Sequence, residues 1–70
     1  MQNANRELLE GLIDAVGVSD ILETMSEICY EKAEHLETNW QDYKAAKWWL
    51  KIAGKLQVFS ISFGKLLAKI

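Results

Sequence analysis

The sequence contains no proline and only one cysteine, Cys29. A single cysteine cannot form a disulfide within the chain, and Cys29 with His35 falls short of the ligand set of a structural zinc site. A chain of 70 residues buries only about 60% of its unfolded surface, so it needs good helix packing or association between copies. We therefore expect one domain without a metal or cofactor, and we predict a homo-oligomer.

Acidic residues are missing from the second part of the chain. Residues 1–42 hold all ten acids and only two basic residues, giving −8, whereas residues 43–70 hold six lysines and no acid, giving +6. The sequence also lacks an apolar run of about 18 residues, and acids stand where the apolar core of a signal peptide would lie. With a lone cysteine, this pattern predicts a cytoplasmic protein without a membrane-spanning helix.

Apolar residues recur at helical spacing along nearly the whole chain. They predict helices over about residues 5–16, 19–38 and 41–56. Asn5 is the expected cap of the first helix, and Gly17 the expected left-handed residue after it.

Two features are expected to bound the second helix. Asp20 and Glu23 form a pair that resembles a capping box at its start. Thr38 and Asn39 are the expected turn residues at its end, which makes the second and third helices an antiparallel hairpin. One long helix through Asn39 is the alternative, because the apolar stripe continues to Tyr43.

Residues 57–69 fit two structures. Phe59, Ile61 and Phe63 alternate with serines as in a strand. A helix instead places all six lysines from Lys44 to Lys69 within about 80° of arc, and this period favours a helical tail. The predicted fold is therefore all-α, with three or four helices built on an antiparallel helical hairpin.

The segment EICYEKAEHLETNWQDYKAAKWW has the most specific pattern in the chain. It contains ICxEKAEHLxxNWQD over residues 28–42, followed by Ala46, Lys47 and Trp49. This pattern resembles a group of short bacterial and phage helical proteins with no known activity. The likeness covers about residues 8–56 and does not extend into the cationic tail after Gly54. It implies a cytoplasmic or phage origin and no chemistry. We expect on this basis a phage- or mobile-element-derived modulator of a host protein.

Candidate chemical sites are weak. Cys29 falls on the apolar side of its helix and is expected to pack as a small hydrophobic residue. His35 is expected on a flank, with a hydrogen bond near the turn, and Trp40 is expected to pack against the core beside it. A dyad of His35 and Asp42 has neither a neighbouring nucleophile nor a glycine-rich anion site. We therefore predict that the protein is not an enzyme.

The strongest candidate site is a surface that combines lysines with aromatic residues. Its members are Lys44, Lys47, Trp48, Lys51, Lys55, Phe59 and Phe63. Trp49 is expected in the core. A basic stripe of this kind fits the solvated back of a helix, an acidic protein partner, or a membrane surface bound by residues 44–70. Nucleic acid is disfavoured by the pI of about 5.2 and the single arginine.

We predict from these features a small non-enzymatic interaction protein that forms a homo-oligomer and binds an acidic protein surface. The alternative is a peripheral membrane-binding protein that uses the cationic amphipathic segment 44–70. Large apolar areas after Trp48 favour assembly, because one hairpin cannot cover them and such areas usually mark interfaces.

Overall fold

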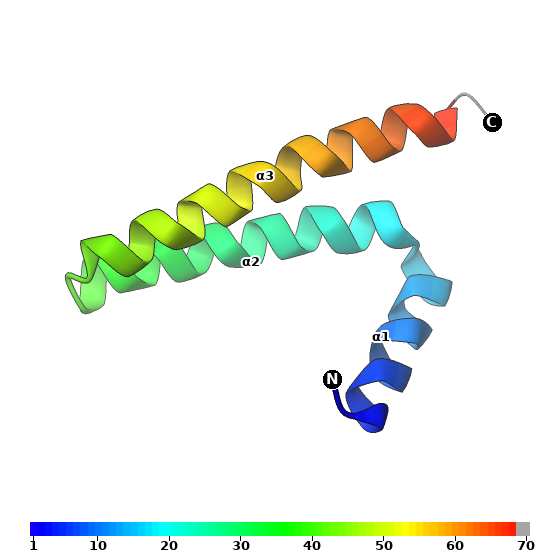
Figure 1. The fold of residues 1–70 in the computed structure, drawn as a ribbon, viewed down its shortest axis with the longest axis horizontal. Helices are drawn as coiled ribbons and strands as arrows, with labels where there is room; N and C mark the ends of the chain where they lie inside the picture. Colours follow the sequence, from blue (N-terminus) through cyan, green and yellow to red (C-terminus); the bar gives the residue numbers. More distant parts are fainter. Residues whose placement is uncertain (69–70) are drawn as a thin grey trace.

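A computed structural model describes residues 1–68 and shows three helices (Figure 1). Helix α1 spans Asn3–Val16, α2 spans Val18–Asn39 and α3 spans Tyr43–Ala68. Helices α2 and α3 form an antiparallel hairpin, and α1 leaves the open end of the hairpin at a steep angle (Figure 1). The all-α class and the hairpin are thus confirmed.

Helix α3 is longer than the sequence suggested. The segments predicted at 41–56 and 57–69 are one continuous helix as far as Ala68, and Lys69 lies outside the described residues. The strand alternative for residues 57–63 is therefore wrong. A lone strand would leave its backbone N–H and C=O groups without partners, whereas a helix pairs them within its own segment.

The chain reverses over Trp40, Gln41 and Asp42, three residues that the structure assigns to no helix. Gln41 has a left-handed φ of 51°. The Asp42 N–H then donates to the carbonyl of Leu36 at 3.0 Å. Asp42 Oδ1 accepts a hydrogen bond from the Ala45 N–H at 3.1 Å and so caps α3. The continuous-helix alternative is wrong.

The predicted turn residues Thr38 and Asn39 belong instead to the last turn of α2.

Small apolar and polar side chains form the seam between α2 and α3. Among the described residues the buried ones are Ser26, Cys29, Ala33, Ala46 and Ala53. The Ser26 hydroxyl donates to the carbonyl oxygen of Ala53 at 2.9 Å. A short side chain can reach the backbone of the other helix only where the two helices approach closely. The prediction that Cys29 packs as a small buried residue is confirmed.

Two flanks of the hairpin lie on either side of this seam. On one, the Tyr30 hydroxyl donates to Gln57 Oε1 at 3.1 Å. On the other, Lys32 Nζ lies 5.6 Å from the centre of the Trp49 ring. Trp49 was expected in the core but is only half-buried. The close approach of the helices leaves no interior space for large side chains, so these lie along the flanks.

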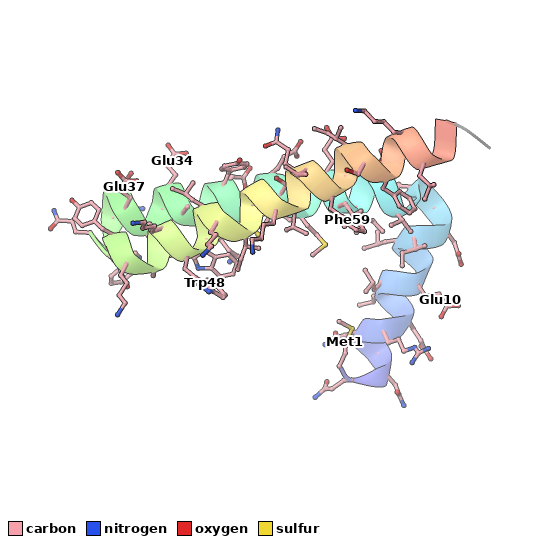
Figure 2. All side chains as sticks on the ribbon, turned by 45° about the horizontal axis from the view of Figure 1, so that its top comes forward. Met1, Glu10, Glu34, Glu37, Trp48 and Phe59 are labelled. Atoms are coloured by element: carbon pink, nitrogen blue, oxygen red, sulfur yellow. The ribbon has the colours of Figure 1, made fainter. Side chains whose placement is uncertain are left out.

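We call the Lys32 side the apolar flank, defined by six exposed residues. On α2, Val18, Met25 and Lys32 follow one another at intervals of seven residues, and Ile28 lies four residues before Lys32, so all lie on one side of the helix. On α3, intervals of eleven and seven residues align Trp48, Phe59 and Leu66. The six residues are Val18, Met25, Ile28, Trp48, Phe59 and Leu66. Trp48 and Phe59 point to the side of the hairpin on which α1 lies, whereas Glu34 and Glu37 point to the opposite side (Figure 2).

Helix α1 has no buried residue. It begins at Asn3 after Gln2, without a side-chain cap, so the predicted cap at Asn5 is wrong. Within the described residues α1 contacts only α2. Gly17 joins the two helices with φ 89° and ψ 162°, a backbone region that is essentially limited to glycine.

The positive φ of Gly17 agrees with the prediction, but its ψ is extended rather than left-handed helical. Its N–H donates to the carbonyl of Ile13 at 2.8 Å and closes α1. Helix α2 then starts at Val18 without a side-chain cap, so the capping pair predicted for Asp20 and Glu23 is wrong. This abrupt junction leaves α1 projecting from the hairpin.

Candidate functional site: the basic face of helix α3

Five described lysines lie on the side of α3 that faces away from the seam. We call this surface the basic face, and its members are Lys44, Lys47, Lys51, Lys55 and Lys65. All five are exposed. Helix α3 contains no acidic residue, so its formal charge is +5. The basic face is therefore the most strongly positive surface among the described residues.

A shallow groove of about 490 Å³ crosses the middle of the basic face. Gly54 lies within the groove, and nothing stands within 4 Å of the position that a Cβ would take there. The groove combines two ammonium groups with apolar side chains, and it is lined by Leu50, Lys51, Gly54, Lys55, Val58, Phe59 and Ser62. Such a surface suits an acidic segment that also presents apolar side chains.

The aromatic members of the predicted site lie at the border of this face. Trp48 is exposed and packs edge to face on Trp49, with 5.0 Å between ring centres. Phe59 is exposed and stacks on the half-buried Phe63 at 6.4 Å. The structure thus divides the predicted residues into two groups. The lysines form the basic face, whereas Trp48 and Phe59 belong to the apolar flank.

Sequence reasoning missed the part that Trp40 takes in the polar cluster at the turn. The Trp40 indole N–H donates to Nε2 of His35 at 3.1 Å, and the side-chain amide nitrogen Nδ2 of Asn39 lies 2.7 Å from Nδ1. The predicted hydrogen bonding of His35 near the turn is confirmed. Trp40 does not pack against the core, however, because its side chain is 71% exposed. The indole instead lies against the imidazole of His35.

The contact with Trp40 indicates which tautomer of His35 is present. An indole N–H can only donate, so Nε2 must accept and cannot hold a hydrogen. The ring hydrogen then lies on Nδ1, and because an amide nitrogen can only donate, Asn39 accepts that hydrogen through Oδ1 once its amide group is turned over. Both ring nitrogens are therefore engaged locally.

The candidate catalytic and metal-binding residues are separated by the fold. Asp42 caps α3, His35 bonds to Asn39 and Trp40, and Cys29 is buried in the seam. Within residues 1–68, no three His, Cys, Asp or Glu side chains converge as metal ligands would. The absence of a metal, a cofactor and an enzymatic activity stays a prediction.

A second groove of about 420 Å³ lies on the apolar flank beside His35. It is open to solvent and lined by Ile28, Glu31, Lys32, His35, Leu36 and Trp49. The half-buried Trp49 ring forms its apolar part, and Lys32 lies over that ring. The groove extends the apolar flank to the turn end of the hairpin.

Comparison with known proteins found no matching family model, no matching curated protein and no matching solved structure. The resemblance to short bacterial and phage proteins therefore stays a prediction. Within the described part of the chain, the helices fall short of the length and apolar character that a membrane-spanning segment needs.

Proposed function

We propose that this protein is a small non-enzymatic interaction protein that binds an acidic surface of a partner protein through the basic face of α3. The observation behind the proposal is the uninterrupted positive charge of that helix, +5 without one acid, beside a groove with apolar walls. Positive surfaces attract complementary negative ones and speed their encounter. The likeness to phage proteins extends the proposal to a modulator of a host protein.

The acidic residues of α2 support this proposal by their position. Glu34 and Glu37 point to the opposite side of the hairpin from Trp48 (Figure 2). The lysines lie on the side of α3 that faces away from the seam, and the acids lie on the outer side of α2, so the two sets point in different directions. A positive surface of this kind remains available for a partner.

A peripheral membrane-binding protein is the second candidate. Helix α3 is cationic on one side, and Trp48 and Phe59 lie exposed at the edge of its lysines. Lysines together with aromatic residues are typical of helices that lie in a membrane interface. The acids of α1 and α2 weigh against anionic lipid, because they would be repelled by the same surface that attracts α3.

The test is a double charge reversal, Lys47→Glu with Lys51→Glu. We expect the variant to keep its helicity, because both side chains are exposed and surface changes of this kind usually cost less than about 0.5 kcal/mol each. Wild type should capture host proteins that also bind it directly after purification. The double variant should no longer bind these proteins. Calorimetry with the purified partner gives the affinity.

A matched control separates this surface from net charge. Gln2→Glu, Arg6→Glu and Thr24→Glu together change the formal charge by the same −4, at exposed positions outside α3. This control should keep partner binding. If both variants lost partner binding equally, the cause would be net charge rather than the basic face. If the double variant kept partner binding, the basic face would be only a solvent-exposed surface without a binding role. Loss of binding to phosphatidylglycerol vesicles alone would favour the membrane candidate.

A further inference from the structure

The apolar side of α1 stays exposed, because within the described part of the chain α1 contacts only α2 and buries no residue. Glu7, Glu10 and Asp14 recur on one side of the helix, and Glu10 points out of the angle between α1 and the hairpin (Figure 2). The apolar residues recur on the other side, and all of them are exposed: Leu8, Leu9, Leu12, Ile13 and Val16. An amphipathic helix in water is stabilised mainly by covering such a stripe.

The hairpin has an uncovered apolar surface of its own. Two members of its apolar flank, the exposed Trp48 and Phe59, point to the side of the hairpin on which α1 lies (Figure 2). Two unpartnered apolar surfaces therefore face the same open angle of the molecule. Contiguous exposed surfaces of this kind mark interaction sites.

The size of the exposed surface indicates how large the missing partner is. The chain exposes 5875 Å² and has a radius of gyration of 14.3 Å. A compact monomer of 8.0 kDa would expose about 4,500 Å², and 70 residues would have a radius of about 11 Å. The excess is roughly 1,400 Å² per chain, which is within the range that each subunit buries in an obligate homodimer.

The opposite charges of α1 and α3 indicate that α1 packs against the apolar flank of the hairpin. Helix α1 has a formal charge of −2 from Arg6, Glu7, Glu10 and Asp14, and α3 has +5. Lys32 lies on the apolar flank, and Lys55 lies where the flank meets the basic face. The acid that lines the flank is Glu31, at the rim of the smaller groove. An acidic amphipathic helix that packs along α3 is therefore attracted by Lys32 and Lys55.

We infer that the protein is a symmetric dimer in which α1 of each copy packs on the apolar flank of the other copy's hairpin. A two-fold arrangement satisfies both surfaces at once, because each copy offers one α1 and one flank. The glycine junction at Gly17 projects α1 away from its own hairpin, which favours exchange between copies over folding back. The partner copy would cover Phe59 at the edge of the larger groove, whereas Lys44, Lys47, Lys51 and Lys65 stay outside, so the dimer would present two sets of these lysines. The dimer itself does not depend on the proposed partner.

Two substitutions on α3 form the first test. Phe59 on the apolar flank and Ile61 on the other side of the helix are 57% and 56% exposed, so their burial in the monomer is matched. Wild type should sediment at about 16 kDa, twice the 8.0 kDa of one chain. Phe59→Glu should raise the dimer dissociation constant by at least about 30-fold, the effect of losing an interface hot spot. Ile61→Glu should leave it unchanged.

The second test asks which helix lies on the flank. In an equal mixture of ¹³C-labelled and unlabelled chains, isotope-filtered NOEs should connect Leu12 methyls of one copy with Phe59 ring protons of the other. Leu12→Glu should dissociate the dimer as Phe59→Glu does. Circular dichroism of all variants distinguishes dissociation from unfolding.

Several outcomes would overturn the inference. A wild-type chain of 8 kDa at all concentrations, with Leu12–Phe59 NOEs only within one chain, would mean that α1 folds back on its own hairpin. A dimer lost in Ile61→Glu and retained in Phe59→Glu would place the interface on the other flank. A monomer that binds vesicles through Leu12 and Phe59 would make lipid the occupant. The Lys47→Glu and Lys51→Glu variant should remain a dimer, so failure of the partner proposal leaves this test intact.

Discussion

The hairpin and α1 are both amphipathic, yet only the hairpin buries side chains. Its seam holds five buried residues and an interhelical bond from Ser26 to the Ala53 carbonyl, whereas α1 has no buried residue. The difference lies in the size of the facing residues. Small side chains allow α2 and α3 to approach each other without a third element, whereas the large side chains of α1 need a surface from elsewhere.

The largest effect should come from enlarging the seam. Ala53 has no exposed surface, so Ala53→Leu must separate the two helices or distort the neighbouring side chains. Overpacking costs about 1–3 kcal/mol, which is much of the stability of so small a domain. We expect thermal unfolding to shift down by about 4–8 °C for each kcal/mol lost.

Ala15→Leu on the exposed surface of α1 is the matched control for the seam. It adds the same side chain to a helix that buries no residue within its own chain, so it cannot overpack the seam, and its effect should stay within about 0.5 kcal/mol. If the two variants unfolded at the same temperature, the seam would not be the part that stabilises the fold.

A smaller effect should come from the junction that keeps α1 apart. Gly17→Ala places a Cβ on a backbone with φ 89°, although nothing lies within 4 Å of it. The penalty is therefore conformational, and we expect about 1 kcal/mol, the low end for such strain, because α1 can turn to relieve it. Small-angle scattering should report a changed radius of gyration, while circular dichroism should show the helices retained.

Gly64→Ala is the control for the junction. Gly64 lies inside α3 with open space around it, so alanine should stabilise the helix by up to about 1 kcal/mol. Opposite signs for the two Gly→Ala changes would confirm that backbone conformation, rather than crowding, sets the effect at Gly17. A stabilising effect at both positions would contradict the junction geometry.

Periodicity predicted the helices, the hairpin and the burial of Cys29, because helix formation follows the spacing of apolar residues. It did not locate the seam, since Ser26 counts as polar although its hydroxyl bonds across to α3. It also misplaced the turn, because Gln41 rather than Asn39 takes the left-handed conformation. Preferences of single residues for that conformation are small, so the packing of the two long helices decides where the chain reverses.

The candidate site was predictable to a similar degree. Lysine spacing predicted the basic face, because every member lies on one helix and follows its period. The contact between His35 and Trp40 was not predictable in this way. It depends on α2 ending at Asn39, so that the next residue folds back over the preceding turn. No fixed spacing signals such a contact.

The smallest effect on stability should come from this turn cluster, because His35, Asn39 and Trp40 are all exposed. We expect His35→Ala to change the free energy of unfolding by less than about 0.5 kcal/mol. The geometry nevertheless makes a sharp prediction about hydrogens. Long-range ¹⁵N–¹H spectra should show the ring hydrogen of His35 on Nδ1, and the Trp40 indole N–H should exchange with water more slowly than that of Trp48.

Substitution of Asn39 tests the same arrangement. Asn39→Asp keeps an oxygen to accept from Nδ1 and should preserve the tautomer, whereas Asn39→Ala removes that acceptor and should let the hydrogen move to Nε2 in part of the molecules. The Trp40 indole then loses its acceptor in that fraction, so its N–H should exchange faster. A wild-type ring with its hydrogen on Nε2 would show that Trp40 and His35 are not bonded, and that the turn is held by the Asp42 cap and the Gln41 backbone alone.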